Sequence, residues 1–267
     1  MPRRRVIKKE PTVIGEIMGG LGNQLFIIFT TIAYSLKHNI KYSIRNIEKR
    51  RKSYFDTPLY QNINVCKENL IGFKRFKEKS YTFQEIPKYD VVILNGYYQS
   101  PKYFNQYKDQ IIDHLNIYQS REILEYDGFL HFRLGDYKHL ECHPVCDIDY
   151  YIKSLEDIHK KDEKELSFIY YFEEEDRNTV EEKIKIFKEK FPRFSFTPVD
   201  TNLPDYKQML SMTTMKYCIM ANSSFSWWGV YLNQRSDKVV YYPKKWFTGS
   251  LSDYDTRDLI EENWNKI

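Results

Sequence analysis

The chain has 267 residues, 42% of them hydrophobic, so it can bury a substantial core and we do not expect a disordered protein. Its 41 Lys and Arg residues against 37 Asp and Glu residues leave a net charge of +4 spread over a mixed surface, which does not indicate a nucleic-acid-binding protein. No stretch approaches the ~18 consecutive apolar residues of a membrane span, and the N-terminus lacks the apolar core of a signal peptide. We therefore expect a cytoplasmic protein without a membrane anchor.

Two basic clusters and four scattered cysteines agree with this class. The cysteines are too few and too dispersed for a disulfide framework, which suits a reducing compartment: Cys66, Cys142, Cys146 and Cys218. The basic clusters sit in no recognisable nucleic-acid-reading module, so we interpret them as a flexible arm and a solvated loop: Arg3, Arg4, Arg5, Lys8 and Lys9, then Lys49, Arg50, Arg51 and Lys52.

Apolar runs that alternate with amphipathic segments predict an α/β protein with mostly parallel sheet. In the first half, strands are expected at 12–18, 40–47 and 90–96, a glycine loop at 19–23, and helices at 24–38 and from Ser100 to about Tyr118. The segment 53–88 has no steady period and receives no assignment. The polar connection at 120–128 is the best domain boundary.

The second half is more regular. Strands are expected at 129–134, 166–172, 194–197, 217–221 and 238–242, and helices at 149–160, 179–191, 205–215 and 224–233. This order fits two Rossmann-like domains facing a central cleft, an N-terminal domain at 1–127 and a C-terminal domain at 128–267. Ligands of open parallel sheets bind at the carboxyl ends of the strands, so the loops that follow strands are the place to look for a site.

The first such loop is the glycine loop before an apolar helix. Gly19, Gly20 and Gly22 let the backbone approach a ligand closely, and the helix start offers N–H groups to an anion. The loop does not match a dinucleotide-binding fingerprint, because Leu25 occupies the third glycine position. A plain tight turn is the alternative.

The second loop ends the expected strand at 129–134. Strand alternation puts Leu134 on an apolar face, and it puts His131 and Arg133 together on the opposite face. A buried guanidinium needs an anionic partner. That partner is either a structural carboxylate such as Asp136 or a diphosphate, which suits the planar fork of arginine.

The third loop contains Asn222, Ser223 and Ser224, before a helix rich in aromatic residues. Small hydroxyl residues commonly cap helices, and the aromatic residues are typical of a core. The same helix start is also a suitable cradle for a phosphate. The absence of a Gly-x-Ser-x-Gly elbow around these serines argues against a serine hydrolase.

Three motifs in this order resemble the α-1,2-fucosyltransferases of glycosyltransferase family 11. They are GGLGNQLF from Gly19 to Phe26, HFRLGDY from His131 to Tyr137, and ANSSFSWWGVYLN from Ala221 to Asn233. Asp149, Tyr150 and Tyr151, and the later Tyr242, Pro243, Lys245, Trp246 and Phe247, add to the likeness.

The resemblance implies a GT-B type fold, GDP-fucose as donor, inversion at the fucose carbon, and no cofactor or required metal. The acceptor would be the 2-hydroxyl of a galactose in a glycan, and no nucleic acid would be bound. The N-terminal domain would face the acceptor, and the C-terminal domain would bind the donor. The alternatives are a transferase that uses another nucleotide sugar and a glycan-binding protein without activity.

The resemblance also implies roles for single residues. Arg133 would bind the donor β-phosphate, and Arg133, Asp136 and Asn23 form the expected catalytic set. The expected donor-binding residues are Gly20, Gly22, Asn23, Gln24, His131, Arg133, Asp205, Asn222, Ser223, Ser224 and Phe225. The family often has a second arginine after the first, where this chain has Leu134.

Two metal interpretations compete with this reading. The pairs Asp147 with Asp149 and Asp253 with Asp255 resemble the Asp-x-Asp motif of metal-dependent transferases, although octahedral cations need more ligands than two carboxylates. A loop with His139, Cys142, His143 and Cys146 has ligand-like spacing for zinc. The general base and the oligomeric state are left open.

Overall fold

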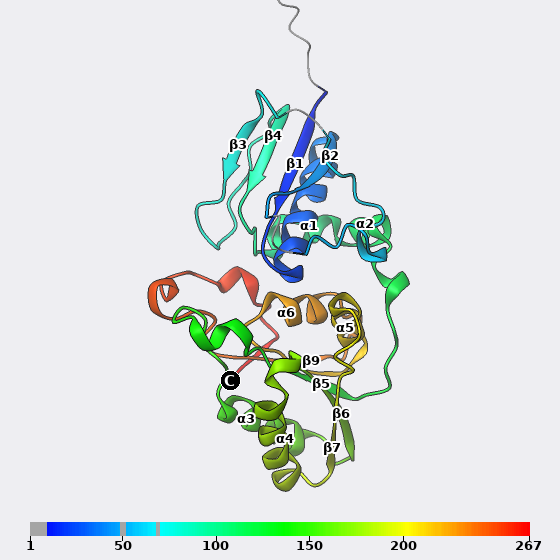
Figure 1. Ribbon diagram of the computed structural model, residues 1–267, viewed down its shortest axis with the longest axis vertical. Coiled ribbons are helices and arrows are strands. Elements are labelled where there is room, and N and C mark those ends of the chain that lie inside the picture. Colours follow the sequence, from blue (N-terminus) through cyan, green and yellow to red (C-terminus); the bar gives the residue numbers. More distant parts are fainter. Residues whose placement is uncertain (1–9, 49–51, 68–69) are drawn as a thin grey trace, which may run out of the picture. The chain divides into compact units, whose positions relative to one another are not determined.

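A computed structural model describes residues 10–48, 52–67 and 70–267, which fold into two compact α/β units (Figure 1). The first unit is Met1–Ile117 with Arg257–Leu259, and the second is Tyr118–Thr256 with Ile260–Ile267. The basic residues at 3–9 and 49–51 lie outside the described residues. The boundary expected at 127 and 128, with an acceptor side before it and a donor side after it, stays a prediction.

The first unit is built on a parallel sheet. Its strands are β1 (Thr12–Ile17), β2 (Lys41–Asn46), β3 (Lys74–Lys77) and β4 (Val91–Asn95), in the order β2-β1-β4-β3. The strand order reverses between β1 and β4, so the loops after these two strands flank a topological switch point. β3 lies in the segment that the sequence left unassigned, because its Lys-Arg-Phe-Lys sequence has a single apolar residue.

Helix α1 (Leu21–His38) follows β1 after the glycine loop and packs against the sheet. The packing is close, since a Cβ added at Gly15 would lie 2.2 Å from Thr31 Oγ1. The helix ends at Asn39, whose left-handed φ of 50° turns its N–H back to the carbonyls of Leu36 and Ser35. α1 therefore has its N-terminus at the carboxyl edge of the sheet.

The helix expected from Ser100 to Tyr118 is broken. Ser100 does accept a hydrogen bond from Lys102 N at 3.3 Å, as a cap should. The following residues form the 3₁₀ turns η2 (Pro101–Tyr103) and η3 (Asn105–Tyr107), then α2 (Lys108–Leu115) and η4 (Ile117–Ser120). The break falls at Phe104, whose φ of −137° and ψ of −7° are not helical.

The second unit has a larger parallel sheet. Its strands are β5 (Gly128–His131), β6 (Leu166–Tyr171), β7 (Phe194–Pro198), β8 (Tyr217–Ile219), β9 (Val239–Tyr242) and β10 (Asn265–Lys266), in the order β10-β9-β8-β5-β6-β7. Counted within the unit this is the Rossmann order 3-2-1-4-5-6, which reverses between β5 and β8. The loops after β5 and β8 therefore flank the position where such sheets bind ligands.

The helices of this unit are α3 (Ile148–Lys161), α4 (Arg177–Lys190), α5 (Asp205–Ser211) and α6 (Ser224–Tyr231). α6 is buried from Ser226 to Tyr231: Trp227 and Trp228 are fully covered, and the Trp227 ring stacks on Tyr231 at 4.7 Å. The start of α6, next to the switch point, is thus held by the core.

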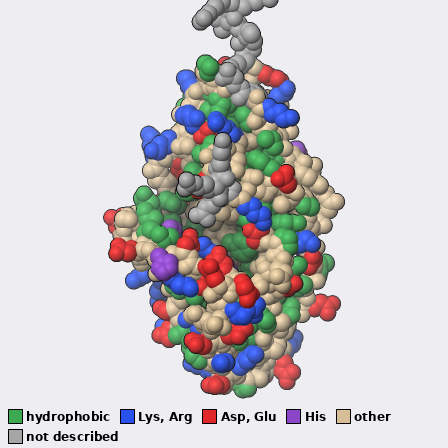
Figure 2. Space-filling model, in the orientation of Figure 1, with side chains coloured by type: hydrophobic (Ala, Val, Ile, Leu, Met, Phe, Trp, Pro, Cys, Tyr) green, Lys and Arg blue, Asp and Glu red, His purple; other side chains and the backbone are tan. Residues whose placement is uncertain are grey.

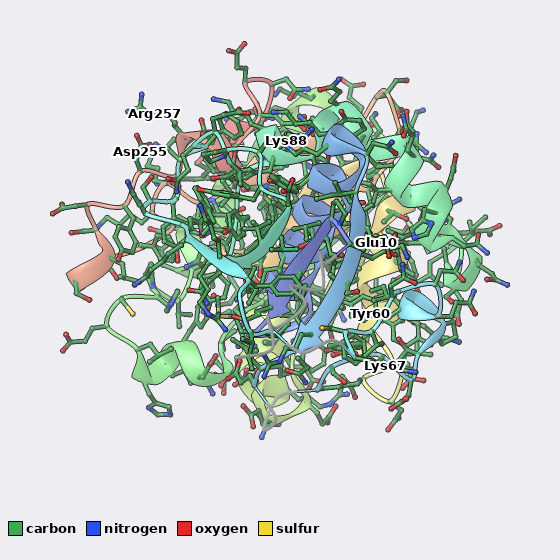
Figure 3. All side chains as sticks on the ribbon, turned by 90° about the horizontal axis from the view of Figure 1, so that it is seen from above. Glu10, Tyr60, Lys67, Lys88, Asp255 and Arg257 are labelled. Atoms are coloured by element: carbon green, nitrogen blue, oxygen red, sulfur yellow. The ribbon has the colours of Figure 1, made fainter. Side chains whose placement is uncertain are left out.

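Short 3₁₀ turns complete both units. They are η1 (Pro58–Tyr60), η5 (Gly135–His139), η6 (Glu174–Asp176), η7 (Met212–Thr214), η8 (Gly249–Leu251) and η9 (Arg257–Leu259). Arg257, which Figure 3 labels, begins the C-terminal stretch that belongs to the first unit.

Among the described residues, no helix has the length and apolar character that a bilayer crossing requires. On the face drawn in Figure 2, basic and acidic side chains are interspersed, as the near balance of charges predicted.

Candidate functional site

The loop after β5 holds Arg133. The strand ends at His131, three residues earlier than predicted, so alternation does not extend to Arg133. Leu134 is buried as expected, and the Arg133 side chain is 22% exposed. His131 is also buried, with its ring 5.5 Å from that of Phe225. The expectation that His131 and Arg133 share one strand face is therefore wrong, because the chain leaves the sheet between them.

Two carboxylates hold the guanidinium of Arg133. Nη1 donates to Glu173 Oε1, Nη2 donates to Asp136 Oδ1, and the group lies 4.9 Å from the centre of the Tyr137 ring. Burial by itself would lower the pKa of Arg133, but Glu173 and Asp136 outweigh it and the pKa is raised. The side chain is therefore a fixed, permanent cation, and the carboxylate partner considered from the sequence is present twice.

Gly135 lets Glu173 reach this position. Its φ is 37°, in the left-handed region, and a Cβ there would lie 2.0 Å from Glu173 Oε2. Its N–H donates to the buried Asp176 Oδ2 at 2.8 Å, and Asp176 also pairs with Lys138. The loops after β5 and β6 are thus bound together around the arginine.

The sequence did not single out Glu173 or Asp176. A usable signal existed, because Glu173 comes just after the predicted strand at 166–172, on the same sheet edge as Arg133. Acidic residues directly after a buried strand are therefore candidates for the same sheet edge as the arginine.

Oxygens of Glu173, Glu175 and Asp176 lie within 4.8 Å of one another, the one such group of possible metal ligands that the described part of the chain contains. Arg133 and Lys138 already pair with two of these three carboxylates.

Two of the four residues of the zinc interpretation, His143 and Cys146, make other contacts. His143 stacks on Tyr137 with ring centres 4.7 Å apart, and the Cys146 thiol donates to Asn222 Oδ1 at 3.5 Å. In the proposed Asp-x-Asp pair, Asp147 caps α3 by accepting from Tyr150 N at 2.9 Å. Neither metal interpretation gains support from these contacts.

The loop after β8 is fastened from several sides. Asn222 Nδ2 donates to the carbonyls of Pro144 at 2.9 Å and Trp246 at 3.1 Å, so its amide joins three segments. Ser223 Oγ accepts from Phe225 N at 3.3 Å as the cap of α6. Tyr137 Oη donates to the Asn222 carbonyl at 3.3 Å, which connects this loop to the loop of Arg133.

His131 is a neutral imidazole at the switch point. Burial and the neighbouring Arg133 lower its pKa to about 3. Its Nδ1 is buried and makes no hydrogen bond with the described residues. The arrangement therefore places one cation, a neutral ring and a capped helix start around the ends of β5 and β8.

Asp205 begins α5, after β7, at the same carboxyl edge and two strands from β5. Its Oδ1 accepts from Tyr206 N at 3.0 Å.

In the first unit, the glycine loop is tied down from both sides. Gly19 N–H donates to Glu48 Oε2 at 2.7 Å, and Gln24 Nε2 donates to the carbonyls of Gly19 at 3.0 Å and Lys52 at 2.7 Å. Gly20 is exposed, has no side-chain cap to offer α1, and a Cβ there would meet nothing within 4 Å. The start of this 18-residue helix therefore borders open space.

Asn23 and Gln99 meet across the switch point of the first unit. Gln99 Nε2 donates to Asn23 Oδ1 at 2.8 Å, and Gln99 is buried. An amide is not a base, so Asn23 can position a substrate by hydrogen bonding but cannot take its proton. Gln99 was not predicted, although it follows the expected strand at 90–96.

Comparison with known proteins points to one family. The model of Glycosyl transferase family 11 matches residues 21–267. The Alpha-1,2-colitosyltransferase of Escherichia coli is 25% identical over 294 residues, covering 96% of this chain and 98% of that protein. The O-antigen biosynthesis glycosyltransferase WbnK of Escherichia coli is 26% identical over 260 residues, covering 88% of this chain and 81% of that protein.

A solved structure has a similar fold. It is a mutant of Arabidopsis thaliana FUT1 in complex with GDP, with a TM-score of 0.50 and 10% identity, covering 91% of this chain and 73% of the other. The α/β fold of GT-B type expected from the sequence is confirmed.

Proposed function

Because the chain belongs to glycosyl transferase family 11 and is a glycosyltransferase, we propose that it moves L-fucose from GDP-fucose to the 2-hydroxyl of a galactose in a glycan. The reaction inverts the configuration of the fucose carbon and needs no metal. The observation that carries the proposal is the fixed cation of Arg133 at the β5–β8 switch point, where Rossmann sheets bind nucleotides.

Arg133 binds the donor diphosphate and stabilises the charge that grows on it as the bond to fucose breaks. Its planar fork suits two phosphate oxygens, and its raised pKa keeps it charged at every working pH. Glu173 and Asp136 each accept from one N–H group of the guanidinium, and their negative charges oppose the bound phosphate.

The neighbouring groups complete the donor site. His131, neutral and buried beside Arg133, adds no competing positive charge and keeps the ring of Phe225 in place. The helix start after Ser223 offers backbone N–H groups to the phosphates. Asp136 orients Arg133. In the first unit, the start of α1 at Gly20 and the amide of Asn23 are the groups that we propose to position substrate oxygens.

A second donor has support from the likeness to a relative that is named a colitosyltransferase. Colitose is L-fucose without its 3-hydroxyl, so a site for one sugar accepts much of the other. The two differ in one hydrogen-bonding group, and a site built to bond that hydroxyl discriminates strongly against a sugar without it.

The test is a transfer assay with purified protein. GDP-fucose and GDP-colitose are offered separately with a panel of galactose-ended glycans, with and without a chelator, and the linkage of the product is read by nuclear magnetic resonance. We expect α-1,2-fucosylated product, in the same yield with chelator as without it. Preference for GDP-colitose would identify the second donor, and glycan binding without transfer from any donor would identify a non-catalytic protein.

A further inference from the structure

Glu78, at the carboxyl end of β3, forms hydrogen bonds with the backbone that follows β4. Its Oε2 accepts from Tyr97 N at 2.7 Å and from Tyr98 N at 2.9 Å, and its own N–H donates to the Asn95 carbonyl at 2.9 Å. One carboxylate oxygen thus fixes two successive amides of the neighbouring strand's exit loop. No feature of the sequence singled it out.

The second of those amides belongs to a residue in an unfavourable conformation. Tyr98 has a φ of 53°, in the left-handed region that aromatic residues rarely adopt. It is fully buried, its hydroxyl donates to the Phe76 carbonyl at 3.1 Å, and its ring meets the edge of Tyr103 at 5.2 Å. The fold holds this turn against its local preference, and Glu78 is one of the groups that does so.

The next residue along the chain is Gln99, whose side chain donates to Asn23 Oδ1 at 2.8 Å. The direction of Gln99 depends on the Tyr98 turn, because the turn sets where the backbone points after β4. Asn23 in turn lies against Gly19, where a Cβ would come within 2.7 Å of Asn23 Nδ2. A continuous set of contacts therefore runs from Glu78 to the glycine loop.

We propose that Glu78 is a positioning residue for transfer: by holding the Tyr97–Tyr98 turn it aims Gln99 at Asn23 and so fixes the position of Asn23 beside the glycine loop. This role rests on the proposed function of Asn23. Glu78 itself touches no substrate and moves no proton of the acceptor, since its second oxygen is buried.

The ionisation of Glu78 offers a separate readout. Burial raises its pKa to about 6, against the opposing effect of the Tyr98 and Tyr97 amides. The titratable groups that face it are Tyr98 and Tyr103, whose pKa values are raised, the latter to about 12, so both stay neutral near pH 6. Below pH 6 the neutral acid accepts these hydrogen bonds more weakly, as the amide of a glutamine does.

The test uses Glu78→Gln, Gln99→Ala and the double variant, with Glu85→Gln as a control, because Glu85 is exposed and pairs with Lys37. Two measurements are made. One is kcat for transfer between pH 5 and 8, and the other is hydrogen–deuterium exchange of the peptide that contains Gly19 to Gln24.

We expect Glu78→Gln to lower kcat at pH 8 by about 10-fold, and Gln99→Ala by as much or more. The double variant should match Gln99→Ala, because both changes act through one bond. Wild-type kcat should fall toward the Glu78→Gln value as the pH drops through about 6, and that limb should be absent in the variant. The Gly19–Gln24 peptide should exchange faster in all three variants and not in the control.

Two results would overturn the role of Glu78. One is a loss of kcat in the double variant equal to the product of the two single losses, and the other is unchanged hydrogen–deuterium exchange of the Gly19–Gln24 peptide in Glu78→Gln. Failure of the proposed function is distinguishable, since it would leave the wild type inactive with GDP-fucose while the exchange of the glycine loop still responded to Glu78→Gln.

Discussion

Glu173, which follows β6, accepts a hydrogen bond from Nη1 of Arg133, which follows β5. A carboxylate is therefore bonded to the arginine that we propose as the phosphate ligand. Glu173 Oε2 occupies the space that a Cβ at residue 135 would need, so a glycine at this position allows the contact as it stands. A carboxylate in this place has two effects. It keeps the arginine oriented and charged, and its negative charge opposes a diphosphate bound to the same guanidinium.

Glu173→Gln should therefore bind GDP more tightly than the wild type. The variant removes a negative charge beside the diphosphate. We expect Kd to fall about 10-fold, or about 1.4 kcal/mol. Isothermal titration calorimetry measures this, with Glu156→Gln as the control because Glu156 pairs with Lys190 on the surface. Equal or weaker affinity in Glu173→Gln would mean that Glu173 supports donor binding.

Gly135→Ala should be more damaging than an ordinary glycine substitution. Both its φ of 37° and the approach of Glu173 oppose a Cβ, whereas Gly72 has a φ of 84° and nothing within 4 Å of a Cβ. Gly72→Ala thus reports strain alone. Urea unfolding should show an extra loss in Gly135→Ala of about 1–3 kcal/mol. Equal losses in the two variants would show that Glu173 moves away without cost.

His131 should make the fold sensitive to mild acid. Its pKa is lowered from 6.5 to about 3, so between these values the unfolded chain binds a proton that the folded chain does not. The free energy of unfolding therefore falls as the pH drops through this window, by about 1.4 kcal/mol per pH unit. Between pH 7 and 5, the wild type should lose about 2 kcal/mol more than His131→Asn. Parallel losses would place the acid sensitivity elsewhere.

Glu78 should have the opposite dependence. Its pKa is raised from 4.5 to about 6, so the folded chain retains a proton that the unfolded chain releases, and stability falls as the pH rises through this window. The full effect is up to about 2 kcal/mol. Glu78→Gln, which cannot ionise, should be at least as stable as the wild type at pH 8 in thermal unfolding. A clear drop in Tm at pH 8 would contradict this.

The sequence predicted the parallel strands, the α/β class and the loops that carry Arg133 and Ser223, because these follow from local periodicity and strand-end chemistry. It did not predict β3, because this edge strand has one apolar residue among charged ones and so lacks an alternating pattern. It also extended β5 past His131. Glu173, Gln99 and Glu78 were not predicted, because their importance depends on which strands are neighbours in the sheet. Asn222 was expected at the phosphates, yet its amide joins three segments, a contact that no local pattern encodes.

The central claim is that Arg133 serves as the cation for a GDP-linked sugar in the absence of metal. The most direct measurement is kcat for fucose transfer from GDP-fucose, in the presence of chelator, for the wild type, Arg133→Lys and the control Arg235→Lys, whose arginine pairs with Asp237 at the surface. We predict a loss of about 100- to 1000-fold in Arg133→Lys and none in the control. Near-normal turnover in Arg133→Lys, or activity that the chelator abolishes, would contradict the claim.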